Sequence, residues 1–223
     1  MIAAAILPSA GPVADRPAEM LVLIGLVALL PFALVTLTSF LKIAVVLSIA
    51  RSALGAPQVP PNSAVTGLAL VLTALVMAPV AEASLALARG GDHRGLLATA
   101  ATLGRSVEPL RAFLERHARP DDRAAFLDVA ARLRRDGTAP TETDLAVLAP
   151  AFVISELRRA FTMGFLVFVP FLVVDLVVSN VLLALGLTQL SPSSVALPFK
   201  LLLFVAVDGW KLLARALALS YAG

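Results

Sequence analysis

Two opposite charges interrupt the apolar C-terminal part of the sequence, at Asp175 and Lys200. They are 25 positions apart, and a turn-forming segment, Gly186–Ser194, lies between them. If antiparallel helices flank that turn, both charges lie at the same depth and can pair, within one hairpin or between neighbouring subunits. Pairing would relieve part of the cost of burying each charge. The alternative is that Lys200 extends to a membrane interface while Asp175 faces water; we expect the pair.

Other charged residues sit at the margins of apolar stretches. Lys42 and Asp208 lie near such ends, where an interface anchor is as reasonable as a specific role. Glu156 and Arg158 precede the third apolar stretch, and such a cluster is often only a polar helix face. We take Lys42, Glu156, Arg158 and Asp208 as candidate contacts in an assembly.

No enzyme signature is present in the sequence. It lacks G-x-x-x-x-G-K-[ST], H-E-x-x-H and G-x-S-x-G. It has no cysteine and only two histidines, His93 and His117, too few for a multi-histidine metal site. Basic residues are matched locally by acids, so the footprint of a nucleic-acid-binding protein is missing. We expect no catalytic, cofactor-binding or metal-binding residue, no cofactor and no nucleic-acid partner.

The composition is that of a membrane protein. The chain is 59% hydrophobic and 15% charged, with a mean hydropathy of +0.92, whereas soluble domains are about half apolar and a quarter charged. Four apolar stretches form two pairs: Met20–Leu41 with Ser52–Ala81, and Ala160–Val174 with Val195–Val207. The first has the length needed to cross the ~30 Å hydrocarbon core as one helix.

Proline and glycine mark a turn within each pair. Three prolines follow Gly55 before Asn62, which is a plausible N-cap for the next helix. The predicted fold is an all-α membrane protein in which two hydrophobic helical hairpins bracket a small soluble helical domain. We place a disordered lead-in at residues 1–19, with a cleaved signal as the alternative. The hairpins are at 20–88 and 151–223, and the polar domain is at 89–150.

The orientation rests on the charges beside the first turn. Lys42 and Arg51 flank it, which favours a cytoplasmic turn. The central domain and both termini would then lie on the periplasmic side of the inner membrane.

Ordered sequence blocks in both hairpins resemble a known family. They are residues 38–43 (TSFLKI), 51–55 (RSALG), 58–62 (QVPPN), 67–73 (GLALVLT), 77–80 (MAPV), 152–158 (FVISELR), 164–166 (GFL), 170–178 (PFLVVDLVV), 197–205 (LPFKLLLFV) and 208–210 (DGW). This pattern is similar to the SctR/YscR/HrcR subunit of type III secretion export gates and to its flagellar counterpart FliP. The resemblance covers residues 20–85 and 150–215.

The resemblance implies a pentameric ring that joins SctS-like and SctT-like membrane subunits and conducts unfolded protein substrates. It implies the bacterial inner membrane, with the assembled gate projecting to the periplasmic side in contact with membrane lipid. A separate ATPase and the proton motive force would supply the energy, so the subunit would not be an enzyme. The family's paired acid and lysine fall on Asp175 and Lys200.

The second turn departs from the family pattern. Many relatives carry a run of methionines there as a gasket, whereas this chain has Leu187, Thr188, Gln189 and Leu190. An apolar ring can close a pore by dewetting. The polar side chains of Thr188 and Gln189 would attract water into this ring and so weaken the closure. A plain turn between helices is the alternative.

Two other functions remain open. The residues Ser39–Ile43 resemble the secretion branch of this family more than the flagellar branch. The flagellar export gate is the alternative. A small-solute or ion transporter using Asp175 and Lys200 as a coupling relay is the alternative from another class.

Overall fold

The computed structural model describes residues 17–56, 59–91, 101–102, 104–134 and 138–222. Within these residues every regular element is a helix, which confirms the expected all-α class. The helices are α1 (Pro17–Thr36), α2 (Phe40–Ala53), α3 (Asn62–Arg89), α5 (Glu108–His117), α6 (Pro120–Leu133), α7 (Leu145–Ala184), α8 (Pro192–Ala206) and α9 (Gly209–Leu219). Of these, α3 and α7 are long and apolar enough to cross a membrane.

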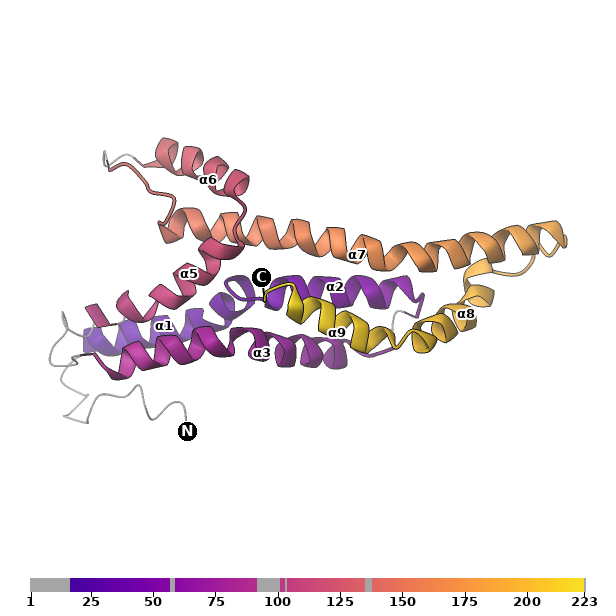
Figure 1. Ribbon diagram of the computed structural model, residues 1–223, viewed down its shortest axis with the longest axis horizontal. Coiled ribbons are helices and arrows are strands. Elements are labelled where there is room, and N and C mark those ends of the chain that lie inside the picture. Colours follow the sequence, from indigo (N-terminus) through magenta and orange to yellow (C-terminus); the bar gives the residue numbers. More distant parts are fainter. Residues whose placement is uncertain (1–16, 57–58, 92–100, 103, 135–137, 223) are drawn as a thin grey trace.

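The longest helix, α7, organises the molecule. It runs along most of the length of an elongated body and lies beside α2, while α9 and α3 lie further from it on the same side (Figure 1). Helix α2 packs against both α7 and α3, and α5 and α6 pack against the first part of α7. The turn between α7 and α8 forms one end of the molecule (Figure 1).

The first apolar stretch is not the single helix that its length predicts. Helix α1 ends at Thr36 and α2 begins at Phe40. Between them, the Thr38 hydroxyl donates to the Leu34 carbonyl and accepts from the Phe40 amide at 3.3 Å. Such side-chain bonds offer the backbone an alternative to the helix, and residues 37–39 use it.

The turn between α2 and α3 also differs at one residue from expectation. Gly55 adopts φ +75°, as the predicted glycine exit requires. The N-cap of α3, however, is Pro61, whereas Asn62 is already in the helix. The Asn62 side chain accepts a hydrogen bond from Arg51 instead of capping α3, so the predicted Asn62 cap is wrong.

The second turn has the geometry that its glycine predicts. Gly186 has φ +71°, its amide donates to the Leu183 carbonyl at 3.0 Å, and the Leu187 amide donates to Leu182 at 2.9 Å. These two bonds form a Schellman motif, which satisfies carbonyls at the end of α7. The α7–α8 hairpin therefore closes with little strain.

The polar segment is joined to the second hairpin through α7. That helix begins at Leu145, so the boundary expected between residues 150 and 151 falls inside it. Pro150 cannot donate to the carbonyl four residues earlier, but its neighbours Ala151 and Phe152 are fully buried against α5 and stabilise the helix there. Residues 1–16, most of the expected lead-in, lie outside the described residues.

Candidate functional site

Asp175 and Lys200 form an ion pair within the chain. The Lys200 ammonium donates to Asp175 Oδ2 at 2.6 Å and to the Ala53 carbonyl oxygen at 3.3 Å. Lys200 is only 5% exposed. Within the described residues, Asp175 Oδ1 has no hydrogen-bond partner. The pair thus joins α7 to α8, and the lysine also reaches the C-terminal end of α2.

An aromatic layer lies beside this pair and holds its helices together. Phe171 of α7 and Phe204 of α8 have ring centroids 6.2 Å apart. Both are nearly buried and pack in one cluster with Ala53 and Leu54 of α2. Because each aromatic residue lies four positions from its charged neighbour, one helical turn separates the ion pair from the apolar layer.

The four predicted closure residues occupy the tip of the α7–α8 hairpin (Figure 1). All of them are exposed; Leu187 is 43% and Leu190 48% exposed. A single chain therefore presents Leu187, Thr188, Gln189 and Leu190 to its surroundings and does not cover them.

A second charge network surrounds Glu156, which is fully buried. Its carboxylate is 3.3 Å from Lys42 Nζ of α2 and accepts from Arg159 at 2.8 Å. It also accepts from the hydroxyl of Tyr221, near the end of the chain. Lys42 is 1% exposed and lies 3.5 Å from the centroid of the Tyr221 ring. One carboxylate therefore ties α2, α7 and the C-terminal residues together.

The network extends to the end of α5 through His117. Arg159 donates to the His117 carbonyl at 2.8 Å, and the imidazole ring lies 5.0 Å from the Tyr221 ring and 4.6 Å from Phe113. Burial lowers the pKa of His117, and the cations Lys42 and Arg159 add to this effect against the opposing charge of Glu156. His117 is thus buried between aromatic rings, and its burial favours the neutral imidazole.

Arg158 points to a different partner from its neighbours. It lies 3.5 Å from Asp122 of α6, and Asp122 also accepts from the Ser155 hydroxyl at 2.7 Å. The Ser155 hydroxyl in turn accepts from the Arg119 amide at 2.9 Å. These bonds fix the start of α6 onto α7.

Asp208 stands apart from both networks. It begins α9 in the left-handed conformation, with φ 53° and ψ 50°. Its carboxylate lies 3.5 Å from Lys211, and both side chains are largely exposed. Of the four predicted assembly contacts, the fold brings Lys42 and Glu156 together and leaves Arg158 and Asp208 elsewhere.

Sequence reasoning missed Tyr221, Ser155 and Asp122. Tyr221 is the only tyrosine of the chain, but nothing in its local sequence connects it to Lys42 or Glu156. Ser155 is directly before Glu156, so a polar pair on one turn was the available signal.

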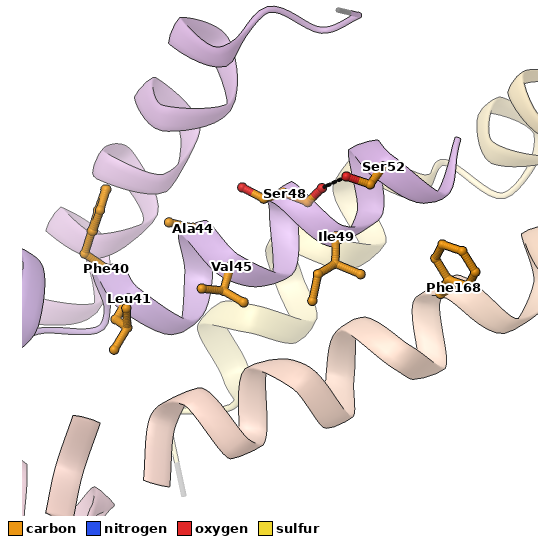
Figure 2. A pocket seen from close by; sticks show the side chains of 8 residues that line it. All are labelled: Phe40, Leu41, Ala44, Val45, Ser48, Ile49, Ser52 and Phe168. Carbon is orange, nitrogen blue, oxygen red and sulfur yellow. Dashed lines mark hydrogen bonds between the residues drawn. The ribbon is translucent and has the colours of Figure 1, made fainter. Parts of the chain in front are cut away.

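A mainly apolar groove runs along α2. It measures about 340 Å³ and follows one face of α2, with Phe168 of α7 on its other side (Figure 2). Its lining is Phe40, Leu41, Ala44, Val45, Ser48, Ile49, Ser52 and Phe168. The Ser52 hydroxyl is already used, since it donates to the Ser48 carbonyl at 2.9 Å. Nowhere in the described part of the chain do three metal-ligating side chains converge.

Comparison with known proteins places these features in a family context. The FliP family matches residues 23–217. The chain is 42% identical to the hypersensitivity response secretion protein HrcR of Ralstonia nicotianae, over 92% of this chain and 97% of that protein. It is 43% identical to the Yop proteins translocation protein R of Yersinia pestis, over 92% and 96% of the two chains. It is also 43% identical to the flagellar biosynthetic protein FliP of Pectobacterium carotovorum, over 96% and 83%.

Proposed function

Because the chain belongs to the FliP family, we propose that it is the pore-forming core subunit of a type III secretion export gate. In this role it conducts unfolded protein substrates across the bacterial inner membrane. The observation that carries the proposal is the match to secretion proteins over 92% of the chain, which spans both hairpins and the polar segment between them.

The surface of the single chain supports a role inside an assembly. Phe161, Phe165 and Leu166 of α7 are each more than 60% exposed, and Leu202 and Val205 of α8 are more than 70% exposed. A monomer in water rarely exposes apolar surface of this extent. Lipid and neighbouring subunits are the partners that would cover it.

The site residues receive roles from this proposal. Asp175 and Lys200 hold the second hairpin in register, and Leu187, Thr188, Gln189 and Leu190 line the closed pore when copies meet around an axis. The two leucines supply the apolar ring at which water is excluded. The side chains of Thr188 and Gln189 hydrogen-bond across that ring.

The expected assembly is a homo-pentamer with SctS-like and SctT-like membrane subunits, projecting to the periplasmic side of the inner membrane. Transport needs no reaction at this subunit, so it acts as a conduit rather than an enzyme.

The decisive experiment is gentle extraction of the chain co-expressed with SctS-like and SctT-like subunits from the same bacterium. We expect a complex whose mass and images show a ring of five copies. A monodisperse monomer in the presence of those subunits would refute the proposal.

The flagellar export gate is a second candidate, favoured by the 43% identity to flagellar FliP. Deletion in the native bacterium separates the two functions. Loss of effector secretion with normal motility supports the secretion branch, whereas loss of motility with normal secretion supports the flagellar branch.

A further inference from the structure

Lys200 connects three helices through a single ammonium group. It binds Asp175 of α7, and its second acceptor, the Ala53 carbonyl, belongs to the last residue of α2. Carbonyls in the last turn of a helix lack partners within the helix, and a cation there also meets the negative end of the helix dipole. Lys200, on a helix that is remote in sequence, therefore supplies a hydrogen-bond donor to a carbonyl group in the last turn of α2.

The turn after α2 leaves room for this contact. Gly55 has φ +75°, and a Cβ atom built there would lie 3.7 Å from Lys200 Nζ. The ammonium consequently sits directly against the turn backbone. Next to it, Phe171 and Phe204 pack on Ala53 and Leu54, so this layer is where the hairpin leaves the body.

Beyond the layer the hairpin is hardly held by the rest of the chain. Between Leu176 and Phe199, Leu182 and Ala196 are the only buried residues. The hairpin projects past the end of α2 in Figure 1. Its orientation is thus set at its base.

Two weak points of the backbone flank that base. Pro170, inside α7, cannot donate to the carbonyl four residues earlier, which favours a kink. Asp208, between α8 and α9, is the one non-glycine residue with positive φ in the described part of the chain. Asp208 lies between the two helices, in a conformation that aspartate adopts more readily than most residues, so the backbone can rotate there.

From this geometry we infer that Lys200 is a clasp that fixes the second hairpin to the C-terminal end of α2. Its release lets residues 171–207 tilt as a unit about Pro170 and Asp208. The tilt moves the tip at Leu187–Leu190. The consequence for pore opening rests on the proposed function, whereas the motion itself does not.

The absence of cysteine in the chain allows a direct measurement. Spin labels on Thr188→Cys, at the tip, and Ser63→Cys, on α3, report the distance between the hairpin and the body; both positions are exposed. The full-length labelled chain is measured in its complex, diluted with unlabelled copies so that one labelled chain dominates each particle.

Three substitutions in this labelled background test the clasp. Lys200→Met keeps the apolar stem and removes both contacts, so the distance distribution should broaden and shift. A tilt of about 20° at Pro170 moves the end of α7, ~21 Å away, by ~7 Å. Asp175→Asn should have a smaller effect, because Lys200 still reaches Ala53. Arg132→Met is the control; it removes an exposed ion pair with Asp128 within α6, away from the hairpin, and should leave the distribution unchanged.

The order of these effects decides the inference. A Lys200→Met distribution that superposes on that of the unsubstituted chain overturns the clasp. Equal effects of Asp175→Asn and Lys200→Met also overturn it, because the contact with α2 would then contribute nothing. If Lys200→Met does not fold, Lys200→Gln, which also removes the ammonium group, takes its place, and an unchanged distribution in that variant has the same force. Tilting without ring formation would reject the pore proposal and keep the clasp.

Discussion

Glu156 lies at the centre of the buried charge network that joins α2, α7 and the C-terminal residues. Three donors, on Lys42, Arg159 and Tyr221, converge on one carboxylate that has no exposed surface. Lys42 has no other acidic partner within salt-bridge distance among the described residues. Removing one member of a buried pair leaves an uncompensated charge, which is far more costly than losing an exposed pair.

Glu156→Ala is therefore expected to destabilise the fold by about 3–5 kcal/mol. Chemical unfolding of the purified protein in detergent measures the change. The control is Glu108→Ala, whose carboxylate is 60% exposed in its pair with Arg111 and should matter by less than about 0.5 kcal/mol. Similar losses in both variants would contradict the structural role of Glu156.

His117 makes stability depend on pH. It lies on α5, outside the two candidate membrane spans, and burial lowers its pKa from the ordinary value of 6.5. Below that value the unfolded chain binds a proton that the folded chain does not, so stability rises with pH in this range. The contribution is present above pH 6.5 and is lost as the pH falls towards the folded pKa.

Thermal unfolding of the unsubstituted protein and of His117→Gln, from about pH 8 to about pH 5, tests this sign. The stability of the unsubstituted protein should fall more steeply on acidification than that of the variant. Parallel curves would show that His117 is not held neutral by the fold.

At the scale of elements, the contact between α2 and α7 organises the body. Gly164 of α7 faces Ile49 of α2, and a Cβ atom built at Gly164 would lie 2.4 Å from Ile49 Cδ1 and 3.1 Å from Ile49 Cβ. The glycine thus permits a close approach of two helices, as small residues do in membrane proteins.

Gly164→Ala should force α2 and α7 apart and cost about 1–3 kcal/mol by overpacking. Gly67→Ala is the matched control within α3. No atom lies within 4 Å of its added Cβ, and the substitution should be neutral or stabilising by up to about 1 kcal/mol. Unfolding midpoints of the two variants in the same detergent give the comparison; equal midpoints would rule out close packing at Gly164.

At the scale of the whole molecule, buried and exposed parts are divided along its length. The body between α2, α3, α7 and α9 holds a continuous apolar core that includes Ile43, Leu47 and Ala160. The α7–α8 hairpin, in contrast, exposes most of its apolar side chains. The chain therefore carries its own scaffold but leaves its projecting hairpin to be covered by other molecules.

Gln189→Glu tests the place of the hairpin tip in the closed gate. A charge in a ring of copies resists dewetting, so the resting complex should leak ions. Conductance of the complex in planar bilayers measures the leak. Thr143→Glu, an exposed position before α7, serves as the control. A resting conductance equal to that of the unsubstituted complex would remove the tip from the closure.

The sequence by itself determined the helical class, the two turns and the juxtaposition of Asp175 with Lys200. Those features follow from local rules: hydropathy and length predict apolar helices, and proline and glycine end them. The tight turn between Asp175 and Lys200 then folds the two helices back on each other and brings the two side chains together. The break in the first apolar stretch is also local, because the Thr38 hydroxyl bonds to the backbone there. A hydropathy pattern does not reveal such a bond.

Only the tertiary structure decided which buried charges meet across remote elements. Tyr221 reaches Glu156, and Lys200 reaches the Ala53 carbonyl, because the helices pack with particular rotations about their axes. Helical spacing tells which residues share a face, but it carries no information on which other helix that face will meet. The pairing of remote charges is fixed by packing of the complete core, so it exists only once the chain has folded.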